Sequence, residues 1–381
     1  MGTFWTNETL RSQKSHGGKP VEICSRVAFW FQEFDSKGLL DVFLAPMKSR
    51  SFWLFGAIAF LALLILASSL SAAVPAKKIR LAYSAFAYAN PPFWIAQDLK
   101  LFEKYGLDSE LVYVSGARPI QAMLGGSIDV SQVGGAATVS AAAQGADVVI
   151  LGTIFTRLNF AVHASPQIKQ ISDLKGKTLV TGTVGGNTYF AALLFLSRFN
   201  WVPNRDVNLI GLGGSPEVLG ALTQGRFPAG VLTAPTTHMA TRMGFREIFD
   251  LASLDFPFPT LSVVSTRKYS DSNPDVILNV LRATSEAIHL YKTRPEVALP
   301  VIAKYMRVPK DDPALLQAQE TFAKHLNLSL TPSLDGIKFI LDFLAEQRPA
   351  LKGKNPADFV NVSFLRKLED EGFFRKLSGS Q

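Results

Sequence analysis

The sequence contains a single cysteine, Cys24, among its 381 residues. That count excludes a disulfide framework and any zinc site built from cysteines. Only 18% of the residues are charged and 48% are hydrophobic, which excludes an intrinsically disordered protein. The four histidines after residue 73 have no metal-like spacing, so we expect no metal site.

Patterns typical of nucleotide binding and hydrolytic catalysis are also missing. Gly176-Lys177-Thr178 lacks the first glycine of a P-loop, because Ile171 stands in its place. Ser215 is followed by Glu217 where a nucleophile elbow needs glycine. The net charge is +8, but basic and acidic residues are interleaved, as in 366–371. We therefore expect no nucleic-acid partner, no cofactor and no catalytic residues.

One long uncharged run stands out, from Phe52 to Leu70. The basic stretch 47–50 precedes it and the small residues 71–73 follow it, which predicts a signal peptide over 47–73. Residues 1–46 are then interpreted as a leader that precedes the true translation start at Met47. The alternative is an uncleaved anchor, since about 19 residues just reach across a bilayer. Either interpretation places the rest of the chain outside the cytoplasm.

After Lys77, short apolar runs alternate with amphipathic segments closed by glycine. Strands are expected at 79–83, 111–114, 129–133 and 148–152, and helices at 119–124 and 136–143. This alternation predicts an α/β architecture with mainly parallel sheets.

The pattern recurs at an offset of 99 residues. Ala122–Gly126 falls on Ala221–Gly225, and the turn Ser115-Gly116 falls on Gly214-Ser215. The repeat predicts two α/β lobes of related build, the second beginning with a strand at 178–181.

Several stretches, in this order, resemble one family. They are Pro92–Ala96, Leu101–Leu107, Gln121–Val130, Ile171–Thr178 and the turn Gly185-Gly186. Over residues 77–375 the chain resembles the nitrate/taurine/sulfonate-type substrate-binding proteins of ABC importers and the related thiamine-pyrimidine (THI5-like) binding proteins.

The resemblance implies a type II periplasmic-binding-protein fold, with two α/β lobes joined by a two-strand hinge. Lobe one would comprise 77–165 plus 251–381, and lobe two 166–250. It also implies an exported monomer that closes around a small polar or anionic solute (a sulfonate, nitrate or similar organic anion). The closed form would then dock on an ABC permease.

Open α/β sheets bind ligands at the carboxyl ends of their strands, and four loops follow such ends. Their glycines let backbone N–H groups approach a solute. Their polar side chains can form hydrogen bonds with the solute, or can simply cap a helix. The candidate ligand-binding residues in these loops are Ser84, Tyr88, Asn90, Phe93, Gly134, Gly135, Ala136, Thr138, Gly185, Gly186, Asn187, Thr188, Thr233 and Ala234. For Gly134 and Gly135, tight helix–strand packing is an equally good explanation.

Three further candidates come from charge and shape. Arg118 and Arg157 lie near predicted strand ends and are able to pair with a sulfonate or carboxylate, although a lone arginine is usually solvated. Phe258, with Phe86, Tyr88 and Phe93, would suit a pocket for a flat solute, although phenylalanine is more often core. Asp129 is expected to fix the turn after Gly126.

Two other functions remain open. The same fold occurs in a menaquinone-pathway enzyme and in pyrimidine synthases of thiamine pathways, but the latter use a cysteine-rich stretch, and no cysteine follows residue 73. A membrane-anchored sensor is the other alternative, if residues 52–70 stay attached.

Overall fold

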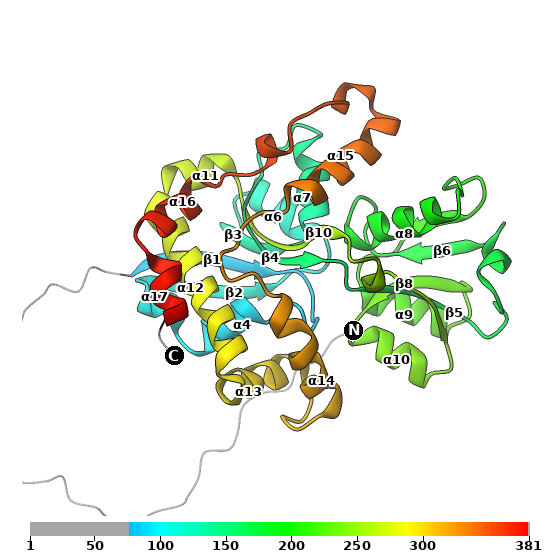
Figure 1. The fold of residues 1–381 in the computed structure, drawn as a ribbon, viewed down its shortest axis with the longest axis horizontal. Helices are drawn as coiled ribbons and strands as arrows, with labels where there is room; N and C mark the ends of the chain where they lie inside the picture. Colours follow the sequence, from blue (N-terminus) through cyan, green and yellow to red (C-terminus); the bar gives the residue numbers. More distant parts are fainter. Residues whose placement is uncertain (1–75, 380–381) are drawn as a thin grey trace, which may run out of the picture. The chain divides into compact units, whose positions relative to one another are not determined.

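The computed structural model describes residues 76–379, which belong to one compact unit (Figure 1). The expected leader (1–46) and signal peptide (47–73) lie outside the described residues. Within 76–379, no helix is both long enough and apolar enough to cross a bilayer.

The first sheet has five strands in the order β2-β1-β3-β10-β4. Its strands are β1 (Lys77–Tyr83), β2 (Leu107–Tyr113), β3 (Val130–Val133), β4 (Val149–Arg157) and β10 (Pro257–Ser265). β1 runs parallel to β2 and β3, whereas β10 is antiparallel to both of its neighbours.

The second sheet repeats this arrangement in the order β7-β6-β8-β5-β9. Its strands are β5 (Phe160–Ala164), β6 (Thr178–Thr181), β7 (Asn208–Gly211), β8 (Ala229–Thr233) and β9 (Arg246–Asp250). β6 is parallel to β7 and β8, and β5 is antiparallel to β8 and β9. β10 and β5 therefore occupy equivalent places, and each enters its sheet from the other lobe.

The chain crosses between the lobes twice, from β4 to β5 and from β9 to β10. Arg157 at the end of β4 pairs with Asp255, which links the two crossovers. The boundary expected between residues 165 and 166 is thus placed too late, since β5 already pairs with the second sheet. The expected return to lobe one at 251 falls between β9 and β10.

Helices cover both sheets. Lobe one contributes α4 (Pro91–Asp98), α5 (Leu101–Lys104), α6 (Arg118–Leu124) and α7 (Gly135–Ala142), and lobe two contributes α8 (Asn187–Arg198), α9 (Ser215–Thr223) and α10 (Thr236–Arg242). After β10 the chain is mostly helical and returns to lobe one as α11 (Arg267–Ser272), α12 (Pro274–Thr293), α13 (Pro295–Met306), α14 (Pro313–Phe322), α15 (Leu334–Gln347), α16 (Ser363–Asp370) and α17 (Phe373–Gly379). Short 3₁₀ turns occur at Ile171–Leu174, Ala252–Leu254, Ala323–His325, Pro349–Leu351 and Pro356–Phe359.

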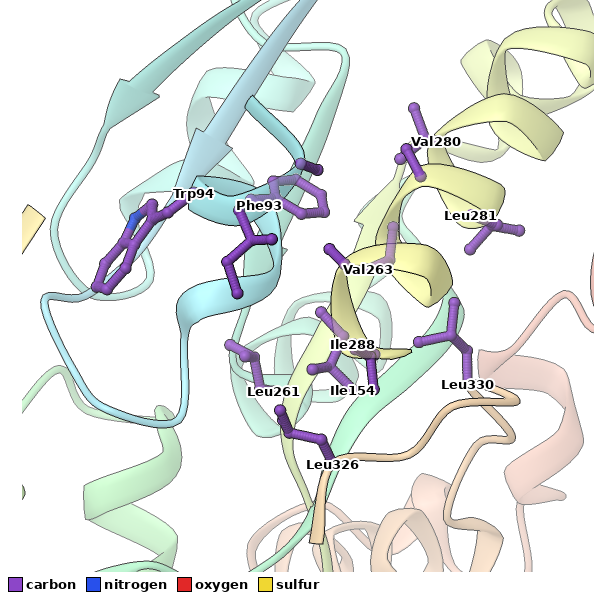
Figure 2. Close-up of a cluster of buried hydrophobic side chains, with 14 of the residues drawn as sticks. Phe93, Trp94, Ile154, Leu261, Val263, Val280, Leu281, Ile288, Leu326 and Leu330 are labelled. Carbon is purple, nitrogen blue, oxygen red and sulfur yellow. The ribbon is translucent and has the colours of Figure 1, made fainter. Parts of the chain in front are cut away.

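The core of lobe one forms where α12 and α4 pack over the first sheet (Figure 2). Ile277, Leu281 and Ile288 are fully buried and recur at helical spacing, so they form one apolar face of α12. They belong to the same buried cluster as Phe93 of α4 and Val263 of β10. Burying each such side chain contributes about 1.5–3 kcal/mol, so this helix anchors the C-terminal segment to lobe one.

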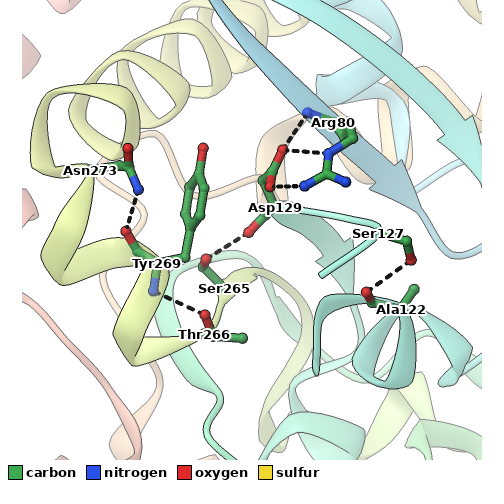
Figure 3. Close-up of polar contacts among 8 residues, drawn as sticks. All are labelled: Arg80, Ala122, Ser127, Asp129, Ser265, Thr266, Tyr269 and Asn273. Atoms are coloured by element: carbon green, nitrogen blue, oxygen red, sulfur yellow. Dashed lines mark hydrogen bonds and ion pairs between the residues drawn. The ribbon is translucent and has the colours of Figure 1, made fainter. Parts of the chain in front are cut away.

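An ion pair fixes the end of this sheet that is opposite to the crossovers (Figure 3). The carboxylate of Asp129 accepts from the backbone N–H of Arg80 at 2.8 Å and from its guanidinium at 2.6 and 3.1 Å. The Asp129 carbonyl accepts from Ser265 Oγ at 2.7 Å, joining β3 to β10. Asp129 thus holds the segment after Gly126 against β1 and β10, which is the structural role expected for it.

Candidate functional site

A cleft of about 120 Å³ lies where the carboxyl ends of the parallel strands of both sheets face one another. Its lining comes from both lobes. From lobe one come Ser84, Ala85, Phe86, Tyr113, Ser115, Gly116, Ala117, Gly134 and Ala137; from the first crossover and lobe two come Phe160, Gly182, Thr183, Gly186, Asn187, Thr188, Gly213, Gly214, Ser215, Pro216, Thr233 and Thr236.

The wall in lobe one is fixed by β3. The backbone N–H of Ser84 donates to the Gln132 carbonyl at 3.1 Å, and the Ser84 carbonyl accepts from Gly116 at 3.0 Å. The Gln132 carboxamide holds the rest of the loop, donating to the Asn90 carbonyl and accepting from the Phe93 N–H. Because the loop after β1 is fastened in this way, it presents a defined surface to the cleft.

Aromatic rings cover part of the same wall. The rings of Phe86 and Tyr113 lie 4.5 Å apart, and each side chain is more than a third exposed. Both also contact Tyr83, which packs edge-on against the fully buried Trp94. Lobe one thus offers the cleft an apolar face.

The wall in lobe two is built from helix starts. α8 begins after Gly186 and α9 after Gly214, both in extended conformation and without a side-chain cap that accepts from the helix N–H groups. The first N–H groups of an α-helix have no partner within the helix and carry partial positive charge. Asn187 and Ser215, the first residues of the two helices, line the cleft. This wall therefore favours oxygen atoms with negative charge.

Serine hydroxyls add further hydrogen-bonding groups. Within residues 76–379, the hydroxyls of Ser84, Ser115 and Ser215 make no hydrogen bond, although all three residues line the cleft. The hydroxyls of Thr183 and Thr233 are engaged with backbone carbonyls within the protein. The serines are thus the hydroxyls best placed to bind a polar solute.

The lining residues carry no charged side chain. Arg118 is exposed at the start of α6 and does not line the cleft, and Arg157 is paired with Asp255. An anion in this cleft would be held by neutral donors and helix N-termini, so shape and hydrogen-bond geometry would select it.

The two lobes touch at the rim of the cleft. A Cβ atom added to Gly116, whose φ is +66°, would lie 2.9 Å from Thr183 Oγ1 and 3.3 Å from the Gly213 carbonyl oxygen. A Cβ atom on Gly214 would meet Ser115 Oγ at 3.2 Å. The structure is therefore a closed form, in which glycines allow the lobes to come together at the rim.

Asn187 joins the lobes beside the cleft. Its Oδ1 accepts from the Ala136 N–H at 3.3 Å, and its Nδ2 donates to the Thr260 carbonyl at 2.5 Å. Close by, Ser140 Oγ donates to the Gly185 carbonyl at 3.0 Å. Asn187 also lies against Gly134, where an added Cβ would be 2.6 Å from its Oδ1.

The structure brings six of the expected site residues together in the lining: Ser84, Gly134, Gly186, Asn187, Thr188 and Thr233. Four others lie next to the lining without being part of it. Gly135 packs against Pro259, as helix–strand packing requires. Ala136 and Gly185 offer backbone groups to Asn187 and Ser140, and Thr138 Oγ1 donates to the Gly134 carbonyl.

The remaining expected residues lie elsewhere. Tyr88, Phe93 and Phe258 are buried in the cores, because their loops and strands turn these rings away from the cleft. Asn90 is also buried, and its side chain donates to the Ala85 carbonyl. Arg118 and Arg157 lie outside the cleft, and Ala234 lines a second depression together with Arg157. We therefore do not carry these seven residues forward as solute contacts.

Several lining residues were absent from the expected set. Tyr113 ends β2 and Ser115 and Gly116 follow it, and 213–216 is the equivalent turn after β7. The internal repeat aligns these two turns with each other, so the sequence was sufficient to predict both turns as part of the lining. Phe160 had no such signal, because it belongs to a crossover strand that the alternation did not reveal.

Comparison with known proteins identifies relatives of this arrangement. The sequence model of the family described as "NMT1/THI5 like" matches residues 90–298. The chain is 25% identical over 272 residues to a protein of Brucella abortus whose name describes it as a binding protein, covering 69% of this chain and 81% of that one. It is 26% identical over 217 residues to a protein of Brachyspira hyodysenteriae named as an ABC transporter periplasmic binding protein, covering 52% and 61%.

Among solved structures, the fold is similar to that of the alkanesulfonate-binding protein SsuA from Xanthomonas axonopodis pv. citri bound to MOPS. The TM-score is 0.63 at 20% identity, covering 76% of this chain and 99% of that chain. The likeness shows the fold of a two-lobed periplasmic binding protein, with two α/β lobes and paired crossovers.

Proposed function

The chain belongs to the NMT1/THI5-like family, and from that premise we propose that it is the extracytoplasmic solute-binding component of an ABC importer. The observation that carries the proposal is the cleft itself, whose lining comes from both lobes. A solute that touches both lobes binds the closed form more tightly than the open form, and so shifts the protein toward closure. The closed form would then be the state that an ABC permease recognises.

The proposed solute is small and polar or anionic, of the sulfonate, nitrate or organic-anion class. The starts of α8 and α9 and the serine hydroxyls supply donors for its oxygen atoms. Phe86 and Tyr113 supply an apolar surface on the opposite wall, which suits a solute with a hydrocarbon part. Since no basic side chain lines the cleft, hydrogen bonds would provide the selectivity.

The residues that line the cleft support a protein that binds a solute without catalysing a reaction. Among the described residues that line the cleft there is no histidine, cysteine, lysine, aspartate or glutamate. The serine hydroxyls in the lining would need an adjacent general base to act as nucleophiles, and none of these side chains lines the cleft to provide one. Expected export through the segment 47–73 fits the same role outside the cytoplasm.

A thermal-shift panel on residues 74–381 tests the proposal. The panel contains sulfonates, nitrate, bicarbonate, thiamine precursors, amino acids and aromatic carboxylates. Each anion is paired with a neutral molecule of similar shape, for instance methanesulfonate with dimethyl sulfone. A ligand that binds only the native state at about 100 times its Kd adds about 2.7 kcal/mol of stability, so a true solute raises Tm clearly.

The expected result is a rise for one anionic class and none for its neutral partners. If the neutral partner raises Tm equally, the proposed solute class is wrong. If only a thiamine precursor raises Tm, the binding role stands and the anionic assignment fails.

A further inference from the structure

Aromatic rings line the cleft at two depths. Phe86 and Tyr113 are 37% and 39% exposed, which places them at the rim. Phe160, at the start of β5, is only 5% exposed, which places it at the inner end. The other described residues that line the cleft from lobe two are glycine, serine, threonine, proline and asparagine, and none has a large side chain. Phe160 is therefore the bulkiest group at the inner end of the cleft.

The second depression lies on the other side of Phe160 and has a volume of about 340 Å³. Among the described residues, Phe160 is the only one that lines both spaces. Its chain neighbours, Asn159 and Ala161, line the second depression alone. On the adjoining strand β8, Thr233 pairs with Phe160 and lines the cleft, whereas Ala234 after it lines the second depression. Phe160 thus separates the two spaces where they come closest.

The backbone around Phe160 is held on both sides. The Phe160 carbonyl accepts from the Leu251 N–H at 3.0 Å, and the Asn159 carbonyl accepts from Thr233 Oγ1 at 3.0 Å. The side chain also belongs to a large buried apolar cluster. Because the strand and the cluster fix its position, the ring of Phe160 is a rigid boundary of the cleft.

The volume of the cleft, about 120 Å³, limits the size of a solute. A cavity of about 150 Å³ holds one benzene ring, and a water molecule occupies about 30 Å³ in the liquid. The cleft therefore has room for a solute of about six non-hydrogen atoms. The contacts of Gly116 close the rim, so a longer chain would have to extend past Phe160.

We propose that Phe160 sets the maximum length of the solute, so that the protein binds anions with one or two carbon atoms and rejects their longer homologues. The inference rests on the proposed function and narrows its solute class. Without the ring, the cleft would join the second depression, which Phe155, Leu158 and Phe322 line with apolar surface. A hydrocarbon chain could then extend into that space.

Calorimetric titration of the full chain with three homologous series tests the inference. The probes are unbranched alkanesulfonates, alkanecarboxylates and uncharged alkanamides, each from the methyl to the octyl member. The amides separate the effect of chain length from the effect of charge.

Two variants remove the ring. Phe160→Ala opens the boundary most, and Phe160→Val keeps a β-branched residue that suits a strand, so one remains if the other fails to fold. Phe258→Val is the matched control. Phe258 is fully buried near the start of β10, the strand equivalent to β5, and it lines neither the cleft nor the second depression.

We expect the unmodified protein and Phe258→Val to bind the methyl and ethyl members of a series and to lose affinity as the chain lengthens. The Phe160 variants should bind the hexyl member about tenfold or more tightly than the unmodified protein does, because each buried methylene favours transfer from water. Their affinity for the methyl member should change little.

The same length profile in the folded Phe160 variants and in the unmodified protein would overturn the inference. So would an unmodified protein that binds the hexyl member as tightly as the methyl member. Short anions that bind without any change of profile would leave the proposed function intact and reject the role of Phe160. A change of profile among the amides alone would support that role and reject the anionic class. No binding of any probe to any of these proteins would overturn both.

Discussion

Asn187 Nδ2 donates a hydrogen bond to the carbonyl of Thr260 at 2.5 Å, and this bond connects the first residue of a lobe-two helix to a strand of the lobe-one sheet. The other end of the same carboxamide accepts from Ala136 in lobe one. The side chain that was expected to cap a helix or bind a solute therefore links the lobes, and it does not cap α8. Asn187 therefore affects solute binding partly by stabilising the closed form of the two lobes.

Replacing Asn187 by alanine should weaken solute binding. The change removes two interlobe hydrogen bonds, each worth about 0.5–1.5 kcal/mol, and so lowers the population of the closed form. We expect the Kd of the solute found by the panel to rise about tenfold or more, measured by isothermal titration calorimetry.

Arg118→Ala is the control for this variant, because Arg118 is exposed and outside the cleft. It should bind as the unmodified protein does. If Asn187→Ala binds with unchanged affinity, the assignment of the cleft is wrong.

Gly116→Ala should impair closure. Its Cβ would approach Thr183 Oγ1 and the Gly213 carbonyl, so the rim contacts of the closed form are lost. Gly126→Ala is a matched control, with a similar φ of +71° and nothing within 4 Å of the added Cβ. Both variants carry the cost of a left-handed alanine, about 1–2 kcal/mol, so their stabilities should fall by similar amounts.

Affinity distinguishes the two glycine variants. Calorimetric titration should show weaker solute binding for Gly116→Ala alone. Equal affinities in the two variants would mean that the rim contact plays no part in binding.

The stability of lobe two should fall in acid because of His163. The side chain is fully buried on β5, and burial lowers its pKa below the ordinary value. Its Nε2 lies 3.3 Å from Thr241 Oγ1 on α10 and 4.0 Å from Glu247 on β9, while His238 nearby further disfavours a second positive charge. The folded state thus favours the neutral ring more than the unfolded state does.

The direction of this pH dependence follows from the linkage between protonation of His163 and folding. Because the folded-state pKa lies below the unfolded value of about 6.5, the full stability is present above that pH and is lost as the pH falls through the folded-state pKa. In His163→Gln this loss disappears. Urea unfolding at several pH values should show the free-energy difference between the two proteins shrinking in acid, whereas parallel profiles would contradict the account.

The ion pair of Asp129 with Arg80 should matter for stability and not for binding. Asp129→Ala removes three hydrogen bonds at the end of the sheet far from the cleft (Figure 3). We expect the free energy of unfolding to fall by about 1–3 kcal/mol, with solute affinity unchanged. Asp108→Asn nearby is exposed and serves as the control, expected to stay within about 0.5 kcal/mol.

Local patterns were sufficient to predict most of lobe one and the start of lobe two. The strand expected at 178–181 is confirmed, as is the helix expected at 119–124, which the structure shows as Arg118–Leu124 with a proline in its first turn. The repeat also predicted the equivalence of the two sheets, because each half carries the same order of turns and helices.

The crossover strand β5 was not predicted, and its environment explains why. Phe160, Val162 and His163 are all buried, so the strand has no polar face and no alternation. A strand that pairs with the other lobe's sheet is defined by distant partners rather than by local sequence.

The sequence identified loops that line the cleft, but not which of their side chains face it. Glycine-rich turns at strand ends identify where backbone N–H groups face a cleft, as at Gly186. Sequence does not say which way a ring in such a loop turns. Phe86 lines the cleft, whereas Tyr88 two residues later is buried in the core.

The central claim is that a small solute binds between the lobes at the starts of α8 and α9, and amide hydrogen exchange tests it most directly. Exchange would be followed in residues 74–381 with and without the solute that raises Tm. We expect the solute to slow exchange at the N–H groups of 187–189 and of Ser215 and Glu217, which lack helical partners. Protection confined to other segments, with these N–H groups unchanged, would contradict it.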